Sequence, residues 1–91
     1  MKKRMQYRFW GRVQGVGFRY TACYLAAALS LTGWVYNDWD GSVLMQAQGE
    51  EENLLLLLQR LELNDRFIQI EQIEQEELPF DTNERSFEVK D

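Results

Sequence analysis

The chain of 91 residues contains no histidine, a single cysteine and a single proline. Without histidine it lacks a common zinc and iron ligand, and also the side chain that most often activates a catalytic nucleophile. The lone Cys23 can form neither an intrachain disulfide nor a cysteine-based metal site, and we interpret it as a small buried apolar residue. We therefore expect a domain without an intrachain disulfide and without the common zinc and iron sites.

Long apolar segments are also missing. Uninterrupted apolar runs, such as those within residues 24–29 and 54–58, are far shorter than the roughly 20 residues that cross a bilayer. Residues 1–6 lead into an alternating pattern and not into an apolar block, so no leader peptide is expected. These features predict a cytoplasmic protein that has no membrane partner.

Acidic residues are absent from the first third of the chain, although the net charge is −5. The first acidic residue is Asp38, and the basic residues before it are Lys2, Lys3, Arg4, Arg8, Arg12 and Arg19. An acidic protein is a poor general nucleic-acid binder, but a local basic region is sufficient for a small anion. We interpret Lys2, Lys3 and Arg4 as residues that solubilise a strand, and Glu50–Glu52 as a solvated helix start.

The spacing of apolar residues predicts the elements of one domain spanning residues 1–91. Strict alternation over residues 5–13 predicts a strand, and a helical pattern follows over about residues 20–31, with Gly33 as its C-cap. Residues 34–39 and 42–48 read as strands joined by a tight turn at Asp40-Gly41.

The second half repeats the helix–strand order. Leu54, Leu57, Leu58 and Leu61 share one helical face. Residues 67–76 predict a strand with a bulge near Glu71-Gln72, and residues 86–90 a short last strand. The order is β-α-β-β-α-β with a short extra strand, which predicts an α+β, ferredoxin-like two-layer sandwich. Its two helices would cover one face of an antiparallel sheet.

The most informative run is Gly11-Arg12-Val13-Gln14-Gly15-Val16-Gly17-Phe18-Arg19, where a strand enters a glycine turn and then a helix. Backbone N–H groups converge at such a helix start and attract an anion, for which phosphate is the natural ligand. Gly15 and Gly17 could instead serve only a turn that requires positive φ. Arg19 favours the anion site, because a cation at a helix N-terminus opposes the dipole unless an anion offsets it.

This run resembles the first signature of the acylphosphatases. The segment Gly33-Trp34-Val35-Tyr36-Asn37, followed by Asp40-Gly41-Ser42-Val43, resembles the second signature of that family. The resemblance extends along the whole chain, and two long motifs in the family's order and spacing are far more specific than a glycine loop alone. It implies metal-free, cofactor-free hydrolysis of acyl phosphates, the mixed anhydrides of a carboxylic and a phosphoric acid.

The resemblance also implies a role for each site residue. The turn formed by Gln14, Gly15, Val16, Gly17 and Phe18 would hold the phosphate through its N–H groups, Arg19 would bind it, and Asn37 would position the attacking water. A carboxylate is a good leaving group, and phosphoryl transfer depends chiefly on positioning and charge stabilisation. Such a site needs no histidine, and the expected partners are a small acyl phosphate and inorganic phosphate as product or inhibitor.

Two other functions remain open. Acylphosphatase-like domains also occur in larger carbamoyl-transferring maturation proteins, so the chain could be a non-catalytic phosphate- or carbamoyl-phosphate-binding module. An RNA-binding sheet shares the fold, and Trp10 between Arg8 and Arg12 faintly resembles its stacking surface. The acidic charge argues against RNA. We expect a stand-alone monomeric enzyme.

Overall fold

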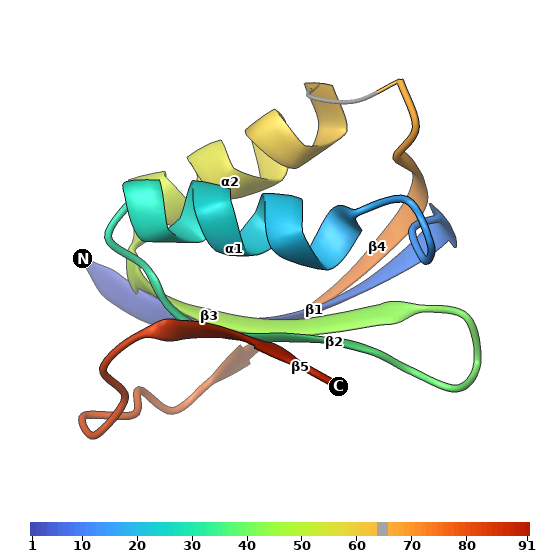
Figure 1. Cartoon of the computed structure of the whole chain (residues 1–91). Helices are drawn as coiled ribbons and strands as arrows, with labels where there is room; N and C mark the ends of the chain where they lie inside the picture. The colour runs from blue at the N-terminus through green and yellow to red at the C-terminus, as the bar shows by residue number, and fades with distance from the viewer. Residues whose placement is uncertain (64–65) are drawn as a thin grey trace.

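The computed structural model describes residues 1–63 and 66–91. In chain order the elements are β1 (Lys2–Arg12), α1 (Phe18–Ala28), β2 (Thr32–Asn37), β3 (Val43–Glu50), α2 (Glu51–Leu63), β4 (Gln69–Leu78) and β5 (Phe87–Lys90). Both helices pack on one face of a single sheet and leave the other face open (Figure 1). The α+β, ferredoxin-like prediction is confirmed. No helix in the described residues is long and apolar enough to cross a membrane.

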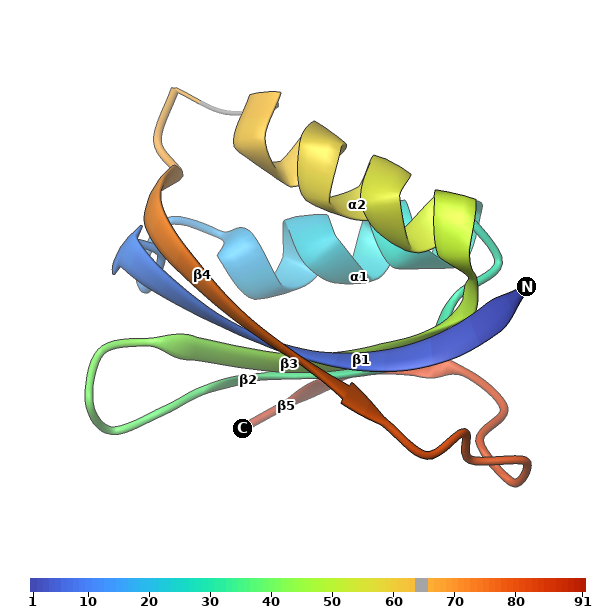
Figure 2. The ribbon, with the colours of Figure 1, turned by 180° about the vertical axis from the view of Figure 1, so that it is seen from behind.

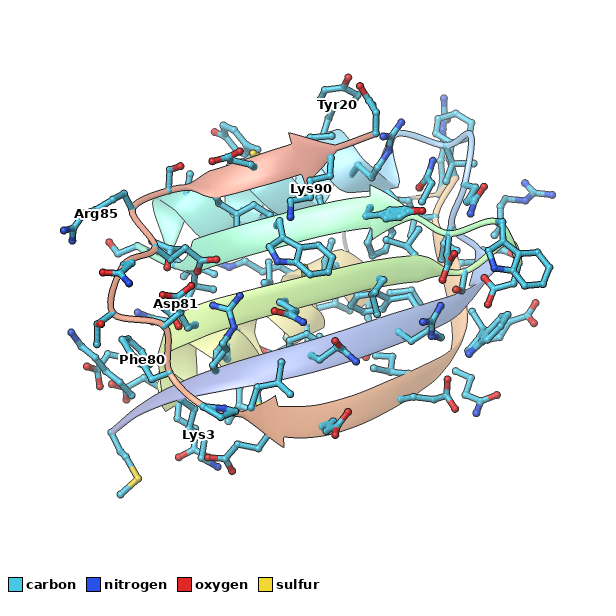
Figure 3. The ribbon with its side chains drawn as sticks, turned by 90° about the horizontal axis from the view of Figure 1, so that it is seen from below. Lys3, Tyr20, Phe80, Asp81, Arg85 and Lys90 are labelled. Atoms are coloured by element: carbon cyan, nitrogen blue, oxygen red, sulfur yellow. The ribbon has the colours of Figure 1, made fainter. Side chains whose placement is uncertain are left out.

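The five strands lie in the order β4-β1-β3-β2-β5. Strand β1 pairs antiparallel with both β3 and β4, and Figure 2 shows β4 at the outer edge beside it. Strand β5 is parallel to β2, so the last strand departs from the antiparallel sheet that we expected. The connection from β4 to β5 runs past the ends of the intervening strands, and β5 therefore enters the opposite edge in the direction of β2 (Figure 3).

The core lies between the sheet and the helices, as the alternation in β1 and the helical spacing of α1 and α2 require. Tyr7, Phe9 and Met45 of the sheet are fully buried there, together with Leu57 of α2. The pairing of β1 with β4 shifts register at Trp10/Gly11, which leaves Glu71 as an extra residue. This confirms the predicted bulge, and Ile70 and Ile73 both pack against the core as a result.

The end of α1 differs from the prediction. The helix stops at Ala28, and Ser30, not Gly33, adopts a left-handed conformation with φ of 58°. Gly33 instead lies inside β2 at φ of 150°, where a Cβ atom would collide with the backbone carbonyl of Gln46 on β3. Glycine is required at this position because β2 and β3 approach each other closely. The local sequence does not reveal that approach.

Cys23 also departs slightly from the prediction. It is half-buried, and its Sγ lies 3.6 Å from the Phe87 carbonyl oxygen on β5. The thiol therefore sits at the boundary between α1 and the edge strand and not deep within the core.

The interpretation of Arg4 as a solubilising residue is wrong. Arg4 is only 5% exposed, on the open face of the sheet. Its guanidinium donates to Glu84 through Nη1 and Nη2, at 2.9 and 3.1 Å, and to the side-chain oxygens of Gln46 and Gln48. Thr32 on β2 also donates to Glu84, at 2.8 Å. We call these five residues the Arg4 cluster.

The Arg4 cluster fixes the β4–β5 connection to the sheet. Gln48 exchanges two further hydrogen bonds with the backbone of Asp81, which Figure 3 shows on that connection beside the strand ends. Charged, amide and hydroxyl side chains from three strands thus converge on the β4–β5 connection. A buried arginine with all its N–H donors satisfied is stable only while that segment supplies its carboxylate.

We expect Glu84→Ala to lower the free energy of unfolding by about 3 kcal/mol, because it leaves the buried Arg4 charge without its partner. Glu76→Ala removes an exposed carboxylate from β4 and should cost less than about 0.5 kcal/mol. Urea denaturation of both variants measures the difference. Equal small losses would show that the Arg4 cluster contributes no net stability.

Candidate active site

The turn between β1 and α1 is built by two glycines in left-handed conformations. Gly15 has φ of 73° and Gly17, the N-cap of α1, has φ of 81°. Neither would meet another atom within 4 Å if it carried a Cβ, so backbone conformation and not crowding requires glycine there. Gly17 offers no side chain to cap the helix, and the first turn of α1 contains no acidic residue. The first N–H groups of α1 therefore remain available to an anion.

Phe18 anchors this turn in the core. Its side chain is 1% exposed, and its ring lies 4.9 Å from that of Phe9 on β1, between centroids. Val13, which precedes the turn, is equally buried. Because both ends of the turn are fixed by apolar packing, the backbone between them is held in one place.

Arg19 follows directly and is oriented by the end of β5. Its Nη1 donates to the Lys90 carbonyl oxygen at 3.0 Å and to Oδ1 of Asp91 at 3.1 Å. Within the described part of the chain, its Nη2 and Nε donate to no protein oxygen. These two contacts hold the Arg19 guanidinium from one side. The N–H donors that remain can bind two oxygens of one planar or tetrahedral anion.

Asn37 is the last residue of β2 and lies across from this turn. Its Oδ1 atom is buried and has no hydrogen-bond partner among the described residues. A buried unsatisfied acceptor costs about 1–3 kcal/mol, so proteins rarely keep one without a use for it. A water molecule donating to Oδ1 would remove this cost.

A side-chain amide joins the turn to the hairpin that follows Asn37. Gln14 donates through Nε2 to the carbonyl oxygens of Asp38 at 2.7 Å and Ser42 at 2.9 Å. The hairpin is closed by Asp38 N–H donating to the Ser42 carbonyl at 2.9 Å. One amide therefore fixes the distance between the glycine turn and the strand that carries Asn37.

Arg8 braces the same hairpin from the open face of the sheet. Its Nη1 donates to Oδ2 of Asp38 at 2.8 Å and to the Ser42 hydroxyl at 2.6 Å. The Ser42 hydroxyl and backbone N–H both donate to Asp40, and together with the charge of Arg8 they lower the pKa of the Asp40 carboxyl group. The carboxylates of Asp38 and Asp40 are therefore engaged in holding the hairpin.

A small cavity of about 90 Å³ lies where these parts meet. It is lined by Val13, Gly15, Gly17, Phe18, Arg19, Tyr20 and Asn37. Five of the predicted site residues are thus brought together, namely Gly15, Gly17, Phe18, Arg19 and Asn37. Gln14 and Val16 are not part of the lining, and the Gln14 side chain acts on the hairpin instead.

Sequence reasoning did not identify four participants. Tyr20 lines the cavity, Arg8 braces the hairpin, and Lys90 and Asp91 orient Arg19. Tyr20 could have been found from its position beside Arg19. The other contacts join residues at least 30 positions apart, and no local pattern marks them. No group of three or more His, Cys, Asp or Glu side chains in the described chain could hold a metal ion.

Known proteins are similar to this chain over nearly its whole length. The acylphosphatase family model matches residues 5–89. An acylphosphatase from Clostridium acetobutylicum is 44% identical over 89 residues, which cover 98% of each chain. The crystal structure of acylphosphatase from Bacillus subtilis matches with a TM-score of 0.89 and 31% identity, over 99% of each chain.

A longer protein contains a similar domain. Full-length HypF, in a phosphate- and nucleotide-bound form, matches all of this chain with a TM-score of 0.90 and 25% identity, but the match covers only 12% of HypF. The chain spans nearly the whole length of the acylphosphatases and a small part of HypF. On the family model and the identity to its relatives, this chain belongs to the acylphosphatase family.

Proposed function

We propose that the cavity holds the phosphoryl group of an acyl phosphate and that Asn37 places a water molecule against it. Family membership makes the chain an acyl phosphate hydrolase, with carboxylate and inorganic phosphate as products. The observation that carries the residue assignment is the unsatisfied, buried Oδ1 of Asn37 in the same cavity as the glycine turn and Arg19.

The phosphoryl oxygens would be bound from two sides. The N–H groups of the turn and of the first turn of α1 supply fixed positive potential, which costs no reorganisation during reaction. Arg19 would add a bidentate contact through the donors that Lys90 and Asp91 leave available. Both interactions strengthen as negative charge develops on the equatorial oxygens and the leaving group.

The nucleophile would be water without a protein base. Neither a carboxylate nor an imidazole is found among the described residues that line the cavity. Asn37 Oδ1 accepts one hydrogen bond from the water and orients its lone pair toward phosphorus. The water oxygen bonds to phosphorus, the bond from phosphorus to the acyl oxygen breaks, and the carboxylate leaves with that electron pair. The proton passes to a phosphate oxygen.

The competing functions have less support. A module that only binds phosphate or carbamoyl phosphate leaves the Asn37 oxygen without a role. For RNA, the residues that would form the stacking surface are engaged within the protein, since Trp10 donates to Glu74 at 2.9 Å and Arg8 binds the hairpin. We therefore propose no nucleic-acid or membrane partner.

We also propose that residues 1–91 act as one domain and as a monomer. A single chain supplies every residue that lines the cavity. The lone Cys23 suits the reducing conditions of the cytoplasm, which we propose as the location.

Asn37→Ala should lower kcat for benzoyl phosphate by at least about 100-fold, because the water loses its orienting acceptor. The inhibition constant of inorganic phosphate should change little, since the turn and Arg19 remain. The free energy of unfolding should change little, because Oδ1 of Asn37 makes no hydrogen bond to another described residue. Hydrolysis followed in the ultraviolet with excess chelator, and urea denaturation, measure these effects. Unchanged kcat in a folded variant would exclude Asn37 as the water-positioning residue.

Arg19→Ala should abolish both phosphate inhibition and turnover. Arg19→Lys keeps the charge but loses the planar pair of donors, so kcat/KM should still fall by about 100-fold. Titration with inorganic phosphate, alongside kinetics with benzoyl phosphate, separates binding from catalysis. Near-normal hydrolysis by Arg19→Ala would show that the mechanism is wrong.

Gln14→Glu should lower kcat about tenfold or more, because a carboxylate placed against two carbonyl oxygens displaces the hairpin that carries Asn37. Phosphate inhibition should weaken less than kcat falls, since the backbone N–H groups of the turn are unchanged and only the added negative charge opposes the anion. Gln72→Glu makes the same charge change at an exposed position of β4 and serves as the control. If both variants keep full kcat, the Gln14 amide has no part in positioning.

A further inference from the structure

The cavity is small for a complete substrate. Its volume is about 90 Å³, whereas pockets for complete small ligands usually exceed about 300 Å³. In the proposed function the phosphoryl group and the attacking water occupy it. The acyl group of the substrate would then extend to the rim of the cavity and contact the side chain that forms this rim.

Tyr20 is the exposed aromatic residue of that rim. It lines the cavity as the third residue of α1, yet 67% of its surface is accessible. Phe18, the other aromatic residue of the lining, is 1% exposed and belongs to the core. Figure 3 shows Tyr20 beyond the edge strand β5, away from the sheet. Its ring also lies 6.0 Å from the Arg19 guanidinium carbon, measured to the centroid.

We propose that the Tyr20 ring is the contact surface for the acyl group, and that the enzyme prefers acyl phosphates with aromatic or bulky apolar acyl groups. This inference rests on the proposed function, because it takes the phosphoryl group to lie in the cavity. With that group beside Arg19, the acyl oxygen points out of the cavity past the ring that borders it. A benzoyl group is large enough to pack on this ring, and an acetyl group offers only a methyl.

An exposed aromatic ring does not by itself mark a binding surface. Tyr24, one helical turn later on α1, is 76% exposed and does not line the cavity. Single exposed apolar residues are normal on protein surfaces. Tyr20 differs from Tyr24 because it borders the same cavity as Arg19 and Asn37, and this difference makes Tyr24 a control of the same residue type on the same helix.

The test compares kcat/KM for benzoyl phosphate with kcat/KM for acetyl phosphate. We expect Tyr20→Ala to lower this ratio about three- to tenfold, and we expect Tyr24→Ala to leave it unchanged. Tyr20→Phe should keep the ratio, because it keeps the ring. The ratio cancels any loss of packing on Arg19, which affects both substrates equally. A ratio that Tyr20→Ala does not change would overturn the inference.

Binding of phenylphosphonate and methylphosphonate, measured by calorimetry, separates this inference from the proposed function. Both compounds carry a phosphoryl-like group, and neither has the anhydride bond that is hydrolysed. If wild type binds phenylphosphonate more tightly and Tyr20→Ala removes the difference, the contact is confirmed even where hydrolysis fails. Hydrolysis with equal binding of both phosphonates would overturn the contact alone. No binding of either, without hydrolysis, would overturn both.

Discussion

The buried charge of Arg4 is the interaction on which the geometry of the molecule most depends. Arg4 lies on β1, between β4 and β3, and binds Glu84 of the β4–β5 connection, which Thr32 of β2 also contacts. Two residues further along, the Ser86 carbonyl accepts the Gly33 N–H at 3.0 Å, and β5 begins. The end of β5 then supplies the oxygen atoms that orient Arg19. The ion pair between Arg4 and Glu84 at one end of the sheet is thus connected, through β5, to the cavity at the other end.

Much of the fold could be predicted because its signals are local. Alternation in β1, the helical spacing of leucines in α2 and the phase change between Ile70 and Ile73 each report on neighbours within a few residues, and all three were confirmed. The family resemblance was also carried by two contiguous motifs. The structure brings Gly15, Gly17, Arg19 and Asn37 of these motifs to one cavity, although their roles remain proposals.

The features that escaped prediction all depend on distant parts of the chain. Gly33 has the appearance of a helix cap, and only the position of Gln46 on β3 shows that a side chain would not fit. Arg4 lies in a basic stretch that is typical of a solvated strand. It is buried because a segment 80 residues later in the chain covers it. Gln14 was assigned to the phosphate through its backbone, while its side chain holds the hairpin. Residue type alone contains no information about these partners.

The order of the strands leaves β4 at one margin of the sheet, and this has a consequence for the chain in a crowded solution. An unpaired margin is a template on which a second copy could add its own strand and begin an aggregate. Strand β4 carries Glu71, Glu74, Glu76 and Glu77, so a second β4 aligned against it would bring carboxylates together. The bulge at Glu71 also disturbs the hydrogen-bonding register that a second strand would need. The opposite margin, β5, has only four residues to offer. The acidity concentrated in the second half of the sequence thus helps to keep the molecules apart.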